Sequence, residues 1–310
     1  MKELLVGNAP CSWGLLENQD KSKAIPYNQM LDELVETGYT GTELGDWGYM
    51  PTDRARLGAE LKQRNNVAML GAYVPVALKD PGTHAEGTAR AVKTSKLIAA
   101  AATTQTPFLV LSDDCGVDPE RTLLAGRIPP SAGLNKGEWK TFSSGADRIA
   151  KAVFDGTGLP TVFHHHCAGY VETPDEIATL LDLTSPEHLG LVFDAGHYYH
   201  GASSEDLDIV AALNRFKERI WYIHLKDIEP NIARLCRERQ WDYFTAMRQG
   251  VYCELGKGCV DLPGLLRWLG ARDYKGYVLV EQDILPGMGT PKESAARNRE
   301  YLRSIEANFS

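Results

Sequence analysis

Histidine and carboxylate side chains end four of the most apolar segments in this chain of 310 residues. A triple histidine at 164–166 ends one run, His197 and His224 end two more, and a fourth run leads into Glu281 and Asp283. Strands that are apolar throughout and polar only at their C-terminal ends are typical of a parallel sheet with its chemistry at one rim. Imidazoles and carboxylates that converge there indicate a divalent-metal site.

Strand-like and helix-like segments alternate along the whole chain. The predicted strands lie at 4–8, 39–44, 67–74, 107–112, 159–166, 189–197, 220–224 and 277–283. The predicted helices lie at 27–36, 52–64, 85–103, 139–154, 175–183, 205–216, 262–269 and 291–307. Eight such units predict an α/β protein with a closed (β/α)8 barrel, and a doubly wound open sheet is the alternative.

Length and composition fit one large domain. With 310 residues and 43% hydrophobic content, the chain is long enough for a single barrel over 1–310. The segment 229–258 is too long for a simple loop, so we expect an insertion there that lies over the barrel mouth. A stretch from 116 to 137, rich in proline and glycine, is expected to be a loop.

Charge and targeting signals narrow the class of protein. The formal charge of −8 argues against a nucleic-acid partner, because phosphate binding needs a basic surface. No apolar stretch reaches the roughly 18 residues of a membrane span, and the first residues lack the apolar core of a signal peptide. The six cysteines form no CxxC pair, which favours free thiols. We therefore expect a cytoplasmic protein that binds no membrane.

Ligand-type residues gather at one rim of the expected barrel. They are Glu43, Asp113, Asp114, His164, His165, His166, Asp194, His197, His224, Lys226, Asp227, Glu281, Gln282 and Asp283. A single such residue at a strand end is more often a cap than a ligand, but four consecutive strands that all end this way favour a metal. Two nitrogen and two oxygen donors suit Mn, Co, Zn or Fe better than Mg or Ca. The alternative is a metal-free binding barrel whose rim residues pair only with one another.

The order of these motifs resembles the xylose-isomerase-like TIM barrel superfamily, which includes sugar isomerases, epimerases, endonuclease IV and dehydratases. In that superfamily the metal is held by a Glu of strand five, an Asp of strand six followed three residues later by His, a His of strand seven and a Glu of strand eight. The pairs Asp194 with His197 and His224 with Asp227 match strands six and seven, and Glu281 matches strand eight.

The fifth strand is more similar to the inosose dehydratases of this superfamily. Here the triple histidine 164–166 stands in place of the Glu and is followed by a loop with Glu172. The similarity extends over nearly the whole chain. The chain departs from the family pattern in the first loop, which reads Pro-Cys-Ser-Trp-Gly from Pro10, and at Lys257, where an acidic residue is expected between two glycines. Both departures are at positions expected near the substrate.

The resemblance implies a hydro-lyase that removes water from a polyhydroxylated cyclic ketone such as 2-keto-myo-inositol. It implies manganese or cobalt, with zinc or iron as further options, and association into a homo-oligomer. The metal ligands would be His164, Asp194, His224 and Glu281. Proton transfer would fall to His166, Glu172, His197 and Lys226, with the acid and base not assigned. A His in place of the strand-five Glu removes one carboxylate of the pair that isomerases use, which favours elimination over epimerisation.

Two rival functions share the expected barrel. A metal-dependent ketose epimerase or aldose–ketose isomerase would exchange a substrate proton without changing the substrate's elemental composition. A phosphodiesterase like endonuclease IV would need several metals and further His and Glu ligands on the early strands, where this chain offers only Glu43. The negative net charge also opposes DNA binding.

Overall fold

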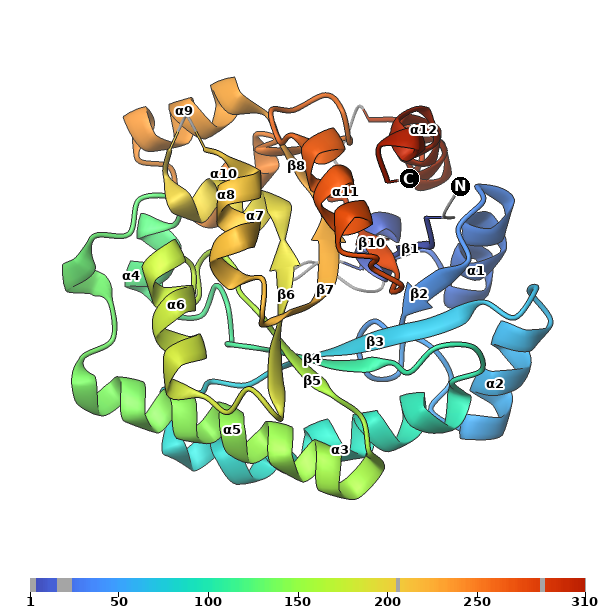
Figure 1. The fold of residues 1–310 in the computed structure, drawn as a ribbon, viewed down its shortest axis with the longest axis horizontal. Helices are drawn as coiled ribbons and strands as arrows, with labels where there is room; N and C mark the ends of the chain where they lie inside the picture. The colour runs from blue at the N-terminus through green and yellow to red at the C-terminus, as the bar shows by residue number, and fades with distance from the viewer. Residues whose placement is uncertain (1–3, 16–23, 205–206, 285–287, 310) are drawn as a thin grey trace.

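Eight parallel strands close into a barrel in the order β1-β10-β7-β6-β5-β4-β3-β2 (Figure 1). The structure is a computed structural model that describes residues 4–15, 24–204, 207–284 and 288–309. The barrel strands are β1 (Val6–Asn8), β2 (Gly41–Glu43), β3 (Ala68–Pro75), β4 (Phe108–Ser112), β5 (Thr161–His164), β6 (Leu189–Asp194), β7 (Ile220–Leu225) and β10 (Val278–Val280). Strand β1 closes the barrel by pairing with both β10 and β2. The predicted (β/α)8 barrel is confirmed, and the open sheet is wrong.

Helices lie between the strands and cover the outside of the barrel, with α3 and α5 side by side along one flank (Figure 1). They are α1 (Tyr27–Glu36), α2 (Arg54–Lys62), α3 (His84–Ala101), α4 (Pro119–Leu124), α5 (Lys136–Thr157), α6 (Pro174–Leu183), α7 (Ala195–Ala202), α8 (Ile209–Phe216), α9 (Pro230–Arg239), α10 (Tyr243–Arg248), α11 (Leu262–Ala271) and α12 (Pro291–Ile305). Four of them, α4, α7, α9 and α10, were not among the predicted helix ranges, although α9 and α10 lie in the segment 229–258 that was predicted as an insertion. Helix α4 forms inside the expected loop because the Asp118 carboxylate caps its first turn. Of the predicted helix 205–216, residues 205 and 206 lie outside the described part of the chain.

The hydrophobic core has two layers, as a barrel requires. A smaller cluster fills the barrel interior, and a larger one lies between the strands and the surrounding helices. The interior cluster consists of Ala9, Ala68, Leu70, Val110, Val162, Val192, Tyr222, Tyr277 and Leu279. Side chains alternate between the two layers along each strand, which explains why the strand sequences are apolar at nearly every position.

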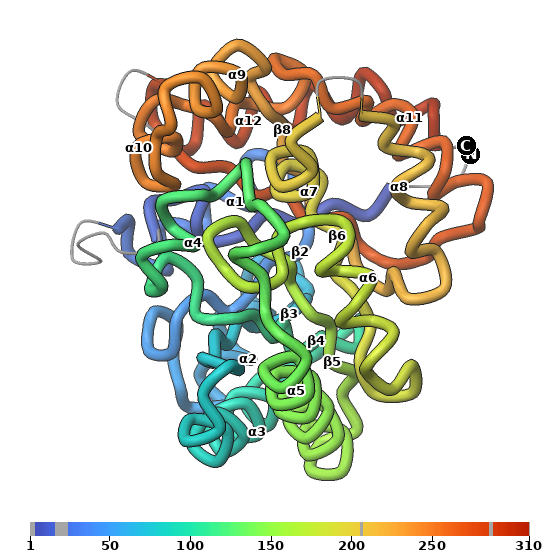
Figure 2. The backbone as a smooth tube through the Cα atoms, turned by 90° about the vertical axis from the view of Figure 1, so that its left-hand side faces the viewer, coloured from blue at the N-terminus to red at the C-terminus, as the bar shows by residue number. Residues whose placement is uncertain are grey.

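The segment between β7 and β10 carries the antiparallel pair β8 (Asp227–Ile228) and β9 (Tyr252–Cys253) together with α9, α10 and α11. Helix α10 packs against α9 and against α4 (Figure 2). The buried Asp227 carboxylate accepts hydrogen bonds from the backbone N–H groups of Gly256, Gly258 and Val260, and so folds the loop around itself. In this loop Lys257 is exposed and pairs with Glu254.

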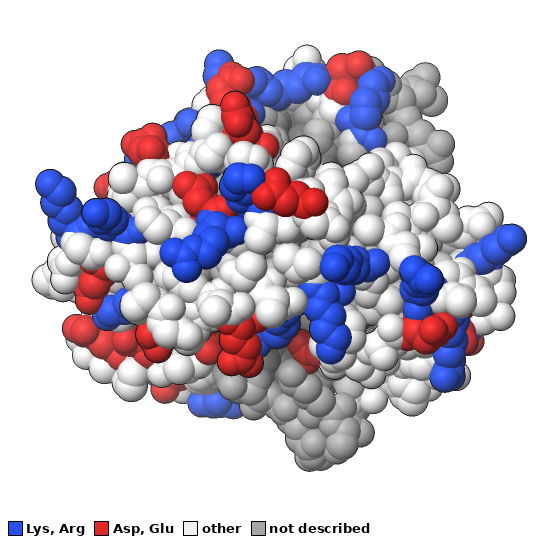
Figure 3. Space-filling model, turned by 90° about the horizontal axis from the view of Figure 1, so that it is seen from below, with Lys and Arg blue, Asp and Glu red and all other residues white. Residues whose placement is uncertain are grey.

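Charges of both signs are interspersed over the face shown in Figure 3, and neither sign forms a continuous stripe there. Nucleic-acid binding uses a basic patch or stripe, so this face does not have the pattern expected for such a partner. Among the described residues, no helix is both long enough and apolar enough to cross a membrane.

Candidate metal centre and active-site pocket

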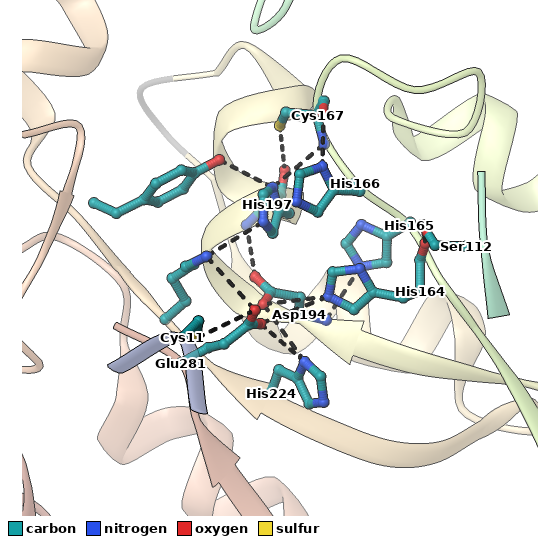
Figure 4. A network of polar contacts seen from close by, with 12 residues as sticks. Cys11, Ser112, His164, His165, His166, Cys167, Asp194, His197, His224 and Glu281 are labelled. Carbon is teal, nitrogen blue, oxygen red and sulfur yellow. Dashed lines mark hydrogen bonds and ion pairs between the residues drawn. The ribbon is translucent and has the colours of Figure 1, made fainter. Parts of the chain in front are cut away.

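Four side chains from four neighbouring strands meet at the C-terminal rim of the barrel (Figure 4). His164 ends β5, Asp194 ends β6, His224 lies in β7, and Glu281 follows β10 by one residue. The strand register places Asp194 directly opposite His224. One donor atom from each of the four residues lies within 4.8 Å of all the others. The structure therefore brings together the four residues that the sequence predicted as metal ligands.

The spacing of these donor atoms suits a single ion. His224 Nδ1 lies 3.0 Å from Glu281 Oε2 and 3.9 Å from Asp194 Oδ2. His164 Nε2 lies 3.7 Å from each of the same two carboxylate oxygens. Metal bonds of about 2.1 Å place neighbouring ligand atoms about 3.0 to 3.4 Å apart and opposite ones about 4.2 Å apart. The observed distances fall in and around that range.

Unsatisfied polar atoms also point to a bound cation. The side chains of His164 and Asp194 are both buried. Within the described residues, the two ring nitrogens of His164 and Oδ2 of Asp194 have no hydrogen-bond partner. Leaving such atoms unpaired in the interior costs free energy, so they need a partner that the protein itself does not supply. A divalent ion bound between them would satisfy His164 Nε2 and Asp194 Oδ2 together.

Glu43 sets the orientation of the His224 ring. Its Oε1 lies 3.2 Å from His224 Nε2, on the side of the ring away from the other donors. Because a carboxylate can only accept, Nε2 carries the hydrogen, and a neutral ring then presents the Nδ1 lone pair to the cluster. Burial lowers the pKa of His224, but Glu281 and Glu43 outweigh burial and raise it to about 10. Without a bound cation, the His224 ring is therefore protonated on both nitrogens and lies between the carboxylates of Glu281 and Glu43.

We expect Glu43→Gln to weaken metal binding by about 10- to 100-fold, because loss of an outer carboxylate lets the ligating imidazole change its tautomer and orientation. Titration of the metal-free protein with Mn would measure the affinity. Unchanged affinity in the variant would mean that Glu43 does not orient the ring. Glu60→Gln is a suitable control, since Glu60 is a surface carboxylate on α2 that pairs with Arg64.

Lys226 places a buried positive charge beside this cluster. Its Nζ lies 4.0 Å from Glu281 Oε1 and 3.6 Å from Asp283 Oδ2. Burial lowers the pKa of Lys226, but Asp283 and Glu281 raise it more, so the side chain stays protonated. Burial raises the pKa of Glu281, whereas Lys226 and the neighbouring imidazoles lower it well below its usual range. The two groups thus stabilise each other's charged forms.

His166 and His197, both predicted to transfer protons, differ in their position relative to the pocket. His166 lines the pocket, and its Nδ1 lies 2.7 Å from the Cys167 carbonyl oxygen. His197 does not line it. The predicted strand 189–197 ends at Asp194, whose carboxylate caps α7 by accepting from the His197 N–H at 2.7 Å. His197 therefore lies in the first turn of a helix, behind His166, with the two ring centroids 3.8 Å apart.

His197 contacts the pocket only through its neighbours. Its Nε2 lies 3.4 Å from Lys226 Nζ, and its Nδ1 lies 2.9 Å from the Tyr252 hydroxyl. Burial and nearby cationic groups lower the pKa of His197 well below its usual range, which keeps the ring neutral. The backbone N–H of Cys167 also donates to His197 Nδ1, at 3.3 Å, so the neutral ring carries its hydrogen on Nε2 and cannot accept a hydrogen bond from the Lys226 ammonium. His197 therefore packs beside Lys226 without a hydrogen bond to it.

Glu172 is also held away from the pocket. Its two carboxylate oxygens accept hydrogen bonds from the backbone N–H groups of Gly126 and Ala168, at 2.6 and 2.8 Å. Ala168 has a positive φ of 67°, a strained conformation for a residue with a side chain. Burial raises the pKa of Glu172 to about 7, although Arg121 and the two N–H donors lower it. Glu172 thus holds the loop that carries His166.

We expect Glu172→Gln to destabilise the fold by about 1 to 3 kcal/mol, because the glutamine NH2 group would face one of two backbone N–H donors that now bond to carboxylate oxygens. Urea unfolding followed by circular dichroism would measure the loss. Glu187→Gln, on an exposed side chain, is the matched control and should leave stability within about 0.5 kcal/mol. Equal stability of both variants would contradict the role given to Glu172.

One pocket of about 800 Å³, counting the part open to solvent, lies over the cluster. It is lined by Ala9, Pro10, Cys11, Leu15, Glu43, Gly45, Asp46, Tyr73, His164, His166, His224, Lys226, Tyr243, Met247, Glu281 and Asp283. Of the two departures from the family pattern, Cys11 lines the pocket and Lys257 does not. The Cys11 thiol lies 3.8 Å from Glu281 Oε1.

Several pocket residues lay outside the predicted site. Tyr243 and Met247 come from α10, where a short amphipathic segment carries no chemical motif. Tyr252 in β9 was also missed; it does not line the pocket, but its hydroxyl lies 2.9 Å from His197 Nδ1. The sequence did mark Glu43 and Asp283 as rim residues, because each lies at the end of an apolar strand. A carboxylate at a strand end can equally be a helix cap, so residue type alone did not assign them to the site.

Fold and site together define the class of protein, a (β/α)8 barrel with a candidate metal centre at the C-terminal rim. The chain belongs to the xylose isomerase-like TIM barrel family, whose model matches residues 31–305. It is 28% identical over 297 residues to the inosose dehydratase of Geobacillus kaustophilus (strain HTA426), covering 96% of this chain and 93% of that one. It is 27% identical over 307 residues to the inosose dehydratase of Bacillus velezensis (strain DSM 23117 / BGSC 10A6 / LMG 26770 / FZB42), covering 98% and 97%.

Solved structures share the fold at lower identity. An L-ribulose 3-epimerase superimposes with a TM-score of 0.69 at 14% identity, covering 99% of this chain and 96% of that one. The probable 3-DHS dehydratase AsbF from Bacillus anthracis gives 0.68 at 13% identity, covering 97% and 99%. At such identities these structures support the fold alone. The full-length relatives bear the names of enzymes, and the prediction that this chain is an enzyme is confirmed.

Proposed function

We propose that this enzyme is a metal-dependent hydro-lyase that removes water from a polyhydroxylated cyclic ketone of the 2-keto-myo-inositol type. The observation that carries the proposal is the group of two imidazoles and two carboxylates, three of which line the pocket beside Lys226 and His166. Full-length similarity to proteins named inosose dehydratase supports the same reaction. In this proposal residues 1–310 act as one catalytic domain, and the segment 229–258 covers part of the mouth.

The donor set fits a transition metal. Two nitrogens and two oxygens suit manganese or cobalt, with zinc or iron as further options, better than magnesium or calcium. When bound by these four residues, such an ion would supply Lewis-acid polarisation of a substrate carbonyl, which makes the adjacent C–H more acidic.

In this proposal His166 accepts the proton from that carbon. Its Nδ1 donates to the Cys167 carbonyl, so in the neutral ring Nε2 carries no hydrogen and presents its lone pair, 3.5 Å from the Tyr243 hydroxyl. Burial, together with the charges of His164 and Lys226, lowers the pKa of His166 to about 3. The ring is therefore neutral at physiological pH, as a general base must be. The same low pKa makes it a weak base, so the proposed step depends on a C–H acidified by the metal.

In the same proposal Lys226 protonates the departing hydroxyl. It lines the pocket, and Asp283 and Glu281 keep it positively charged. In this scheme His197 and Glu172 are positioning residues, because neither lines the pocket. His197 contacts Lys226, and Glu172 holds the loop that carries His166.

Mass spectrometry of 2-keto-myo-inositol incubated with the Mn-loaded protein in deuterated water tests the reaction. The proposal predicts a product lighter than the substrate by one water, after allowance for deuterium. An epimerase or isomerase would give a product of unchanged composition that gains deuterium at carbon. That second result would contradict the proposed dehydration and assign the enzyme to epimerisation or isomerisation.

A further inference from the structure

The pocket changes character between its floor and its mouth. Its floor holds Lys226 and three of the metal-ligand candidates, His164, His224 and Glu281, whereas its mouth is formed by the loops after β1 and β2 and by α10. The mouth residues are Ala9, Pro10, Cys11, Leu15, Gly45, Asp46, Tyr243 and Met247. Among these, Asp46 alone is charged, and most of the others are apolar or aromatic.

The mouth has two walls that face each other. In the closed barrel β1 and β5 are four strands apart in either direction, so their ends lie on opposite sides of the rim. The Tyr243 hydroxyl lies 3.5 Å from His166 Nε2, which places α10 over the end of β5. Pro10 and Leu15 follow β1 and therefore stand across the opening from α10.

The wall beside β1 is closely packed. Gly45 has a φ of 71°, and a Cβ added there would lie 2.8 Å from Leu15 Cδ2 and 3.3 Å from Pro10 Cβ. Leu15 and Pro10 therefore pack directly against the glycine backbone. On the opposite wall, Tyr243 and Met247 are four residues apart in α10, so their side chains lie on the same face of the helix.

A free cyclitol would leave these walls unused. Its hydroxyl groups would meet the polar floor, but the apolar walls above offer few partners for further hydroxyls. A phosphate or carboxylate group is also disfavoured there, because none of the described residues that line the mouth is Lys or Arg and Asp46 would repel an anion. An uncharged apolar group would fill the space between the walls, and its transfer out of water is favourable.

We infer that the mouth is a second subsite, which takes an uncharged apolar substituent carried by the substrate ring, such as an aryl or alkyl group. This inference rests on the proposed function for the floor, because a polyol ring must occupy the floor for its substituent to reach the walls. It names the substrate class more closely, as a polyhydroxylated ketone that bears an apolar group.

Calorimetric titration of the Mn-loaded protein with phenyl β-D-glucopyranoside and methyl β-D-glucopyranoside tests the subsite without requiring turnover. Burial of part of the phenyl ring predicts a Kd about tenfold lower for the phenyl compound. Met247→Gln and Leu15→Gln should each reduce this ratio severalfold. Leu123→Gln, on an exposed side chain of α4 that does not line the pocket, should leave the ratio unchanged.

Equal affinity for the two glucosides, or no binding of either one, would overturn the subsite. Turnover of 2-keto-myo-inositol by the same preparation is measured separately. If the phenyl compound binds more tightly while 2-keto-myo-inositol is not dehydrated, the subsite stands and the proposed reaction is wrong. If dehydration occurs and the two glucosides do not differ, the reaction stands and the subsite is wrong.

Discussion

Asp194→Asn is expected to reduce kcat by roughly 1,000-fold or more, since a catalytic metal supplies several kcal/mol of transition-state stabilisation. The change keeps the size of the side chain, and the amide oxygen can still cap α7 by accepting from the His197 N–H. It removes the negative charge at Oδ2, which has no hydrogen-bond partner in the described part of the chain and faces His164 and His224. Metal content after dialysis and steady-state kinetics measure the two losses.

Asp113→Asn is the matched control for this variant. Asp113 is likewise a buried carboxylate after a barrel strand, and it belongs to the predicted rim. Its oxygens instead accept from the backbone N–H groups of Leu78 and Tyr170, and it does not line the pocket. The control should lose stability but bind metal with unchanged stoichiometry. Full metal content and activity in Asp194→Asn would contradict the proposed centre.

Lys226→Met is expected to reduce kcat by about 100- to 10,000-fold, the usual contribution of a positioned proton donor. Methionine preserves most of the apolar stem, which lies over Gly196, and removes the ammonium group, whose Nζ lies 4.5 Å from the centroid of the Tyr252 ring. Asp283 and Glu281 would then lose their shared cation. A proton-transfer role predicts a fall in kcat with a smaller change in KM, whereas a purely electrostatic role in the metal site would lower the metal affinity instead.

Lys257→Met serves as the control for loss of a positive charge near the same insertion. Lys257 is exposed and pairs with Glu254 outside the pocket, so activity should stay within about twofold of the wild type. If Lys226→Met is as active as this control, Lys226 has no part in proton transfer.

The barrel was predictable because its strands are apolar on both faces and regularly spaced between helices. Each predicted barrel strand appears in the structure, although several are shorter than predicted. The predicted strand 189–197 extends three residues too far, because the Asp194 side chain caps a helix that starts at the next residue. Helix α4 was missed because six residues with a proline at the first position look like part of a loop.

The rim residues could be predicted because they follow apolar strands, whose ends the barrel must gather, and the family resemblance then singled out four of them as candidate metal ligands. The roles of the remaining residues depended on side-chain direction, which sequence spacing does not determine beyond the end of a strand. Glu172 illustrates this, because a turn at Ala168 directs its carboxylate to backbone donors rather than to the pocket. Tyr243 and Met247 depend on how α10 folds over the mouth.

The most direct test of the central claim is to titrate metal-free protein with Mn and follow loss of water from 2-keto-myo-inositol by mass spectrometry. Dehydration should be absent without metal, rise with added Mn, and reach its maximum at one ion per chain. The same titration of Asp194→Asn should give no product at that stoichiometry. Formation of the dehydrated product by metal-free protein, or equal rates in the variant and the wild type, would contradict a metal centre at these four residues.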